Sequence, residues 1–362
     1  MSNPSHSIFI GTSSKGAGAN RGIYGVSLDA STGALSGPEL AGAAPDPAFL
    51  AWHPHRKILY ASGETVPATP GATAGAVNAY ALNDENRTLT LLGAHPTGGL
   101  AVTHLAVDAT GRMLITVSYH GGQIAAFPLG DDGAPGACSM LIQTSGQLGP
   151  NQARQDKPHP HSVTISPDNR HAYVCHLGLD RIFCFGLDLA GAKLTPAGEF
   201  AAKPGAGPRH SKFSADGRFF YVSNELDSTT AVYSCDPATG ALKSRQIVST
   251  LPADFTGTNT PAEIQVAPGG RFVYVSNRGH ESLAIFARDA VDGTLARPMA
   301  VPCGGRNPRN FALSADGAWL VCANLGTNSL ESFRVDSGSG QLTASGQLPD
   351  VPWPTCVLFA PA

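Results

Sequence analysis

A repeated pair of strands is the feature that most limits what this chain of 362 residues can fold into. An apolar strand, a turn of the type Ser-x-Asp-Gly and a second strand ending in Tyr-Val-Ser-Asn recur along the sequence, most clearly at 210–224 and 264–277. Equivalent turns centre on residues 56, 111, 169, 217, 270 and 317. A unit that recurs about every 50 residues is typical of repeat architectures, in which each unit buries its apolar face against its neighbours.

Each copy continues into a third strand and a further turn. Strands at 230–234 and 283–286 precede Asp/Gly turns at 236–240 and 292–293, and these residue types tolerate the positive φ of tight hairpins. The chain has 42 glycines and 28 prolines but only 14% charged residues, which suits short strands better than helices. Four strands in about 50 residues make one propeller blade, so about seven blades account for the whole length.

The seventh copy is divided between the two ends of the chain. Residues 354–359 supply its first strand, 8–12 its second and 22–28 its third. Joining the termini in this way leaves no free blade edge. The sequence therefore predicts an all-β fold, a seven-bladed β-propeller with four antiparallel strands per blade, as a single domain over residues 1–362.

Charge and composition exclude several partners. The net charge is −3 and there is no Lys/Arg run, so neither nucleic acid nor an anionic membrane surface is expected. No apolar stretch approaches the length of a membrane span, and the N-terminus lacks the pattern of a secretory signal. The seven cysteines form no CxxC and lie mostly in apolar strand runs, which indicates free thiols and a cytoplasmic location. Without G-x-G-x-x-G or a P-loop, no nucleotide cofactor is expected, nor any other cofactor.

Hairpin geometry predicts where the polar residues collect. The start of the first strand and the end of the second lie together, at the end opposite the Ser-x-Asp-Gly turn. Positions seven and eight residues before each turn, and eight after it, are rich in polar side chains for so weakly charged a chain. These are His104, His161, Arg209, His210, Glu263, Arg309 and Asn310 before the turns, and Glu64, Tyr119, Glu225 and Arg278 after them. Together with His159, two residues before His161, they form a candidate site at one rim of the channel.

These residues also have structural explanations. His161 could bond a carbonyl of a neighbouring blade, and Arg209 and Arg278 could form structural ion pairs with Glu225 and Glu263. His104, His161 and His210 come from three successive blades, but adjacent positions on a strand face opposite ways. These histidines therefore need not converge, and we expect no metal site. Long stretches at 65–76, 131–158 and 249–261 are either functional loops or slack insertions.

The chemistry of the rim suits a small anionic molecule. Arginine binds carboxylate or phosphate through a bidentate fork, and histidine and glutamate act as general acid and base near neutral pH. The chain contains no G-x-S-x-G, so an acyl-serine route is not indicated.

The sequence resembles the lactonase family of seven-bladed propellers, which includes bacterial 6-phosphogluconolactonases and the fungal 3-carboxy-cis,cis-muconate lactonizing enzyme. The resemblance covers essentially the whole chain and is clearest at 159–168, 207–210, 223–225 and 275–278. It implies that His161, Arg209, Glu225 and Arg278 are catalytic, and that the other rim residues bind substrate. The sequence departs from the family pattern at His176, where many relatives have Asp, and at Ser118, where Asn is usual.

Three functions remain open on the sequence alone. The first is a metal-independent hydrolase that opens a small anionic lactone, similar to 6-phosphogluconolactonase, with arginines binding the anion. The second is a muconate-type lactonizing cycloisomerase, which needs the same cations and the same acid/base group. The third is a non-catalytic binding platform, because a propeller fold does not by itself imply catalysis.

Overall fold

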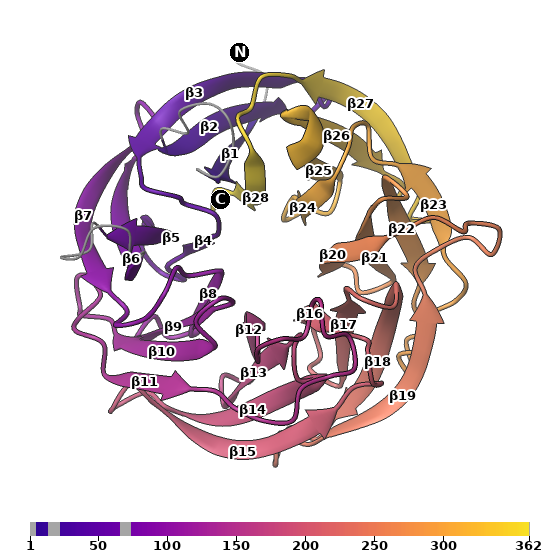
Figure 1. The fold of residues 1–362 in the computed structure, drawn as a ribbon. Coiled ribbons are helices and arrows are strands. Elements are labelled where there is room, and N and C mark those ends of the chain that lie inside the picture. Colours follow the sequence, from indigo (N-terminus) through magenta and orange to yellow (C-terminus); the bar gives the residue numbers. More distant parts are fainter. Residues whose placement is uncertain (1–4, 14–21, 66–73, 362) are drawn as a thin grey trace.

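The computed structural model describes residues 5–13, 22–65 and 74–361, which form a closed ring of seven four-stranded antiparallel sheets around a central channel (Figure 1). The predicted seven-bladed propeller is confirmed. From the channel outward, the blade that joins the termini consists of β28 (Pro354–Phe359), β1 (Ser5–Thr12), β2 (Gly22–Asp29) and β3 (Leu35–Ala43).

The other six blades follow in chain order. The next three are β4 (Leu50–Trp52), β5 (Ile58–Thr65), β6 (Ala74–Asn83), β7 (Thr88–Pro96); β8 (His104–Val107), β9 (Met113–Ser118), β10 (Gln123–Pro128), β11 (Met140–Gln143); and β12 (Pro160–Ile165), β13 (His171–His176), β14 (Arg181–Asp188), β15 (Lys193–Ala201). The last three are β16 (Pro208–Phe213), β17 (Phe219–Asn224), β18 (Thr229–Cys235), β19 (Leu242–Ser249); β20 (Thr260–Val266), β21 (Phe272–Arg278), β22 (Ser282–Ala287), β23 (Met299–Pro302); and β24 (Pro308–Leu313), β25 (Trp319–Asn324), β26 (Ser329–Val335), β27 (Leu342–Leu348).

The ring closes through its termini. Strand β28 pairs antiparallel with β1, with Ile8 opposite Phe359 and Ile10 opposite Val357. Figure 1 shows β28, in yellow, beside β1, in indigo, in this blade. The predicted split blade is therefore confirmed.

The repeated Ser-x-Asp-Gly turn holds the two inner strands of a blade together. In the copy between β16 and β17, the Ser214 hydroxyl donates to Asp216 at 2.5 Å and accepts the backbone N–H of Phe219 at 3.0 Å. Gly217 takes the left-handed backbone conformation that the turn requires, with φ of 69°. In the copy before β13, Asn169 replaces glycine and adopts φ of 59°, which asparagine tolerates better than most residues.

The tyrosine of the repeated Tyr-Val-Ser-Asn strand links neighbouring blades. The Tyr221 hydroxyl donates to the carbonyl of Gly293 at 2.9 Å, and Tyr274 donates to Gly340 at the same distance. Each acceptor lies in a hairpin turn of the following blade. Burial of an aromatic ring with its hydroxyl satisfied explains why the sequence repeats this residue.

Five inner strands begin with a register irregularity, and in three of them a single inserted histidine or arginine changes where the side chains point. The pairing register shifts between Pro160 and Ser162, between Pro208 and His210, and between Pro308 and Asn310. The inserted residues are His161, Arg209 and Arg309. A bulge disrupts strict alternation and re-aims side chains, so consecutive residues such as Arg209 and His210 both contribute to the channel.

The long stretches are partly structured. Residues 131–158 are not one loop, because β11 forms the outer strand of its blade within them; the irregular segment is 144–159. The segment between β19 and β20 is a loop as expected, whereas 66–73 lie outside the described residues. Within the described ranges the one helix is η1 (Leu325–Thr327), and none is long and apolar enough to cross a membrane.

Candidate active site

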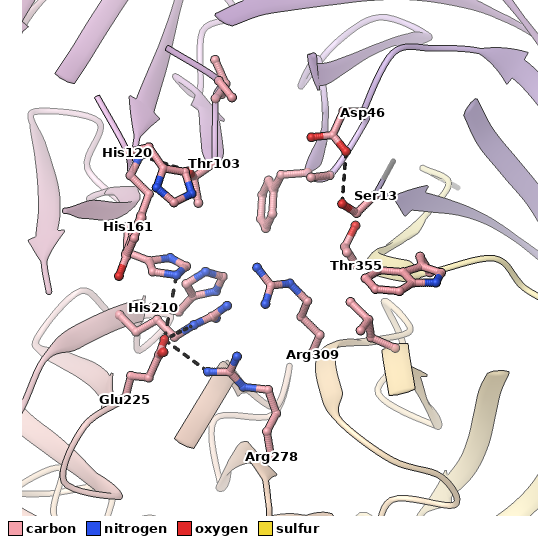
Figure 2. Close-up of a pocket in the computed structure, with 18 of the residues that line it drawn as sticks. Ser13, Asp46, Thr103, His120, His161, His210, Glu225, Arg278, Arg309 and Thr355 are labelled. Carbon is pink, nitrogen blue, oxygen red and sulfur yellow. Dashed lines mark hydrogen bonds and ion pairs between the residues drawn. The ribbon is translucent and has the colours of Figure 1, made fainter. Parts of the chain in front are cut away.

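A polar pocket of about 360 Å³ lies at the end of the channel where the inner strands begin, as the hairpin argument predicts (Figure 2). Its volume is in the range of small-molecule sites. The lining residues are Ser13, Asp46, Ala48, Phe49, Ala101, Val102, Thr103, Tyr119, His120, Arg154, His161, Arg209, His210, Glu225, Arg278, Arg309, Leu325, Trp353 and Thr355.

The Glu225 carboxylate contacts three arginines of the pocket. Glu225 directly follows β17, and only 3% of its surface is exposed. Its Oε2 lies 2.9 Å from Nε of Arg209 and 3.2 Å from Nη2 of Arg278, while Oε1 accepts from Arg154. Burial alone would raise the pKa of this carboxyl, but Arg278 and Arg209 hold it well below the usual value. Glu225 is therefore ionised at neutral pH.

Arg278 is held by hydrogen bonds to its own blade, whereas Arg209 is fixed by burial beside Glu225. Arg278, the last residue of β21, donates to the carbonyls of Thr260 and Pro261 at 2.9 and 3.3 Å. The side chain of Arg209 is 2% exposed at its bulge, and burial lowers its pKa to about 9, with a further contribution from Arg278. Arg278 joins its own blade to that of Glu225, so the alternative of an ion pair between blades is also observed.

His161 faces the same carboxylate. Its Nε2 lies 3.9 Å from Oε2 of Glu225 (Figure 2). Burial, and then the nearby Arg209, lower the pKa of the imidazole well below 6.5. The ring is therefore neutral at pH 7 and able to accept a proton, and Glu225 favours the imidazolium that would form. Nδ1 is buried and has no hydrogen-bond partner among the described residues.

Arg309 is the arginine of the pocket that is not committed to an ion pair. Its guanidinium points into the open centre of the pocket (Figure 2), and it has no hydrogen-bond or ion-pair partner in the part of the chain that the structure describes. Burial, and then Arg278, lower its pKa to about 10. Across the pocket, Asp46 accepts a hydrogen bond from the Ser13 hydroxyl at 3.1 Å.

A second polar layer lies deeper in the channel. Glu263 accepts from Nδ1 of His210 at 2.9 Å and from the Asn310 amide at 2.5 Å, and the His104 ring lies 5.2 Å from that of His210. Of these, His210 lines the pocket, whereas Glu263, Asn310 and His104 line the channel below it. They therefore support the pocket floor from beneath.

The three histidines converge, although strict strand alternation did not require it. The rings of His161 and His104 each lie 5.2 Å from His210. The bulge at Arg209 is the physical reason, because it shifts the strict alternation. No group of three or more metal-ligating side chains is placed to hold an ion within 5–13, 22–65 and 74–361.

Three further predicted residues have different placements. Tyr119 lines the pocket. His159 does not: its ring stacks on Tyr119 at 4.0 Å, and its nitrogens contact the Tyr119 carbonyl and Asp156. His159 therefore positions Tyr119. Glu64 belongs to β5, but its side chain lies outside what the structure describes.

Arg154 was not among the predicted site residues. It lies in the 144–159 segment rather than on a repeated strand, so no alignment of the blades could find it. The one available signal was the unusual length of residues 131–158, which the sequence left open between a functional loop and an insertion.

The pocket has an excess of positive charge. Arg154, Arg209, Arg278 and Arg309 face two carboxylates, Glu225 and Asp46. Burial lowers the pKa of His161 and of His210, so these rings add no charge at neutral pH. The formal excess of two positive charges suits an anionic ligand.

The fold and the site define a seven-bladed β-propeller with a cationic small-molecule pocket at one mouth of its channel. Residues 7–359 match the model of the family described as lactonase, 7-bladed beta-propeller. The 6-phosphogluconolactonase of Bacillus subtilis (strain 168) is 33% identical over 97% of each chain. The chain belongs to this lactonase family and is an enzyme of the lactonase class.

Solved structures agree with this assignment. The periplasmic gluconolactonase of Pseudomonas aeruginosa superposes with a TM-score of 0.90 at 28% identity, covering 99% of each chain. A putative 6-phosphogluconolactonase from Bacteroides fragilis gives a TM-score of 0.88 at 30% identity, covering 99% of this chain and 98% of the other.

Proposed function

We propose that the protein hydrolyses the lactone of a phosphorylated sugar acid, with 6-phosphoglucono-δ-lactone as its substrate. The observation that supports this most directly is the excess of two positive charges in the pocket. A phosphate monoester brings about −1.5 to −2 charges at pH 7, which matches that excess. The name of the Bacillus subtilis relative points to the same substrate.

The geometry suggests how the ring is opened. Neutral His161 takes a proton from water, whose oxygen attacks the lactone carbonyl carbon. Glu225, 3.9 Å from Nε2, stabilises the imidazolium. The tetrahedral intermediate then collapses, the ring C–O bond breaks, and the imidazolium returns its proton to the leaving alkoxide.

Arg309 is the best candidate to stabilise the oxyanion. Arg209 and Arg278 are engaged by Glu225, whereas the guanidinium of Arg309 points into the pocket centre. A preorganised donor at the developing negative charge is a large contribution to catalysis. We further propose that the reaction needs no metal ion, because His161 and Arg309 together supply the base and the electrophile.

We expect the protein to accelerate hydrolysis of freshly prepared 6-phosphoglucono-δ-lactone well above the spontaneous rate. Acid release in a pH-stat measures this directly. The rate should be unchanged by EDTA, since no step uses a metal. Loss of the activity in EDTA would contradict the metal-free mechanism. No acceleration would contradict the proposed substrate, and loss of diene absorbance with a muconate-type dicarboxylate would then support the cycloisomerase.

We expect Arg309→Gln to lower kcat by about 10²–10³-fold, the usual effect of removing one oxyanion donor. The loss should be similar for the phosphorylated and unphosphorylated lactones, because both form the same oxyanion. Arg112→Gln is the control, since this exposed arginine lies at the turn end of its blade. A loss confined to KM would instead place Arg309 in ground-state binding.

A further inference from the structure

The segment that carries Arg154 is fixed on both sides of this residue. On the N-terminal side, the Arg154 N–H donates to the Asn151 carbonyl at 3.0 Å. On the C-terminal side, Gln155, 1% exposed, accepts the Asn151 N–H at 2.9 Å and donates to the Leu177 carbonyl at 2.9 Å. Asp156 then contacts His159 at 2.8 Å, and the His159 ring stacks on Tyr119. These contacts fix the backbone around residue 154 and therefore place the Arg154 side chain at the wall of the pocket.

Arg154 differs from the other two arginines that contact Glu225. Its side chain is 39% exposed, against 2% for Arg209 and 14% for Arg278. Its guanidinium contacts Glu225 and the hydroxyl of Tyr119, both lining the pocket. Arg154 is thus the cation that can rotate toward a ligand without disturbing a buried strand.

The charges around Glu225 also favour such a movement. The single carboxylate of Glu225 forms ion pairs with three guanidinium groups. If Arg154 turns away, Glu225 keeps Arg209 and Arg278 and is not left as an unpaired buried charge. An anion that enters the outer pocket can therefore compete for Arg154 at low cost.

We propose that Arg154 is a specificity-determining clamp that binds the phosphate of the substrate and sets the preference for phosphorylated over unphosphorylated lactones. This inference rests on the proposed function. The buried pair of His161 and Glu225 receives the reacting carbonyl deep in the pocket. Arg154, the most exposed of the arginines on Glu225, meets the far end of the sugar acid, where its phosphate lies.

The test compares Arg154→Gln with wild type on 6-phosphoglucono-δ-lactone and on glucono-δ-lactone. The ratio of kcat/KM for the phosphorylated lactone to that for the unphosphorylated one should fall by about 10–100-fold, the usual scale for a charge-assisted hydrogen bond. The change should appear mainly in KM. Lys157→Gln is the matched control, because it removes an exposed cation from the same segment and should leave the ratio unchanged.

Two results would overturn the clamp. An equal loss on both lactones would make Arg154 a structural support of Glu225, and an unchanged ratio would remove it from recognition. If wild type hydrolyses neither lactone, the proposed function fails, but the clamp is still tested by calorimetric binding of 6-phosphogluconate. The clamp requires that wild type binds it at least 10-fold more tightly than Arg154→Gln (about the lower end for a charge-assisted bond); equal affinity, or no binding to wild type, refutes it.

Discussion

Glu225→Gln should lower kcat for lactone hydrolysis by about 10³-fold, within the range for disabling general acid–base catalysis. The substitution keeps the shape of the side chain but removes the charge that favours protonated His161. The substitution should also affect the positions of Arg154, Arg209 and Arg278, because the same carboxylate forms ion pairs with all three. Stopped-flow or pH-stat assays with saturating lactone measure the loss.

The pH profile separates this catalytic role from a structural one. The Glu225 carboxylate raises the pKa of His161, although burial and Arg209 lower it more. Its removal should therefore shift the acid limb of kcat/KM to lower pH while the maximum falls. The variant should also lose about 3 kcal/mol of folding free energy, because buried guanidinium groups keep their positive charge without a partner. The assay temperature must lie well below the melting temperature of the variant.

Glu331→Gln is the matched control for this prediction. Glu331 is a buried glutamate of β26, 7% exposed, that does not line the pocket. Burial raises its pKa, so its neutral isostere should be tolerated. If the control loses as much kcat as Glu225→Gln, the loss is not specific to Glu225. If Glu225→Gln retains full kcat, Glu225 has no part in catalysis.

The fold was predictable because the copies of the repeat share turn and strand residues that can be recognised in the sequence. Most of these turns have a residue in the left-handed conformation, such as Gly217, and four blades bond to the next through the same tyrosine, such as Tyr221. Strand order and ring closure followed from counting these units. Loop paths do not follow such rules, and so β11 was hidden within a stretch that looked irregular.

The site was predictable where it lies on the repeat. His161, Arg209, Glu225, Arg278 and Arg309 all occupy register positions, and the structure brings them to one pocket. The sequence left the direction of a side chain open where it depends on a local irregularity. Strict alternation would have separated consecutive residues, but the bulges at the starts of β12, β16 and β24 aim them at one channel.

Pocket residues off the repeat could not be predicted in this way. Arg154 reaches the site from the 144–159 segment, and Asp46 from the connection between β3 and β4. Their placement depends on packing among loops, such as the contacts of Gln155. The repeated strands therefore supply the proposed catalytic groups, and the connections between strands supply the proposed specificity group, Arg154.

His176→Leu should make the protein markedly more resistant to acid. His176 ends β13 with 0% exposure, and its ring packs on Phe183 at 4.2 Å. Neither ring nitrogen has a hydrogen-bond partner among the described residues. Burial lowers its pKa from 6.5 to about 3. A buried imidazole without partners costs free energy even when neutral, and leucine, of similar size, removes that cost.

The pH dependence follows from the two pKa values of His176. Above pH 6.5 the ring is neutral in both the folded and the unfolded chain; between pH 6.5 and about 3 the unfolded chain binds a proton that the folded chain does not. Stability therefore falls by about 1.4 kcal/mol per pH unit in this window, or about 2 kcal/mol at pH 5. Buried His104, His161 and His210 also weaken wild type in acid, but they are present in both proteins, so the difference between wild type and His176→Leu isolates His176. Urea unfolding at pH 7.5 and pH 5 measures it, with His95→Leu as a control at a half-buried histidine of β7. An advantage of His176→Leu that is the same at both pH values would show that the ring is protonated equally in the folded and unfolded chains, and would contradict the prediction.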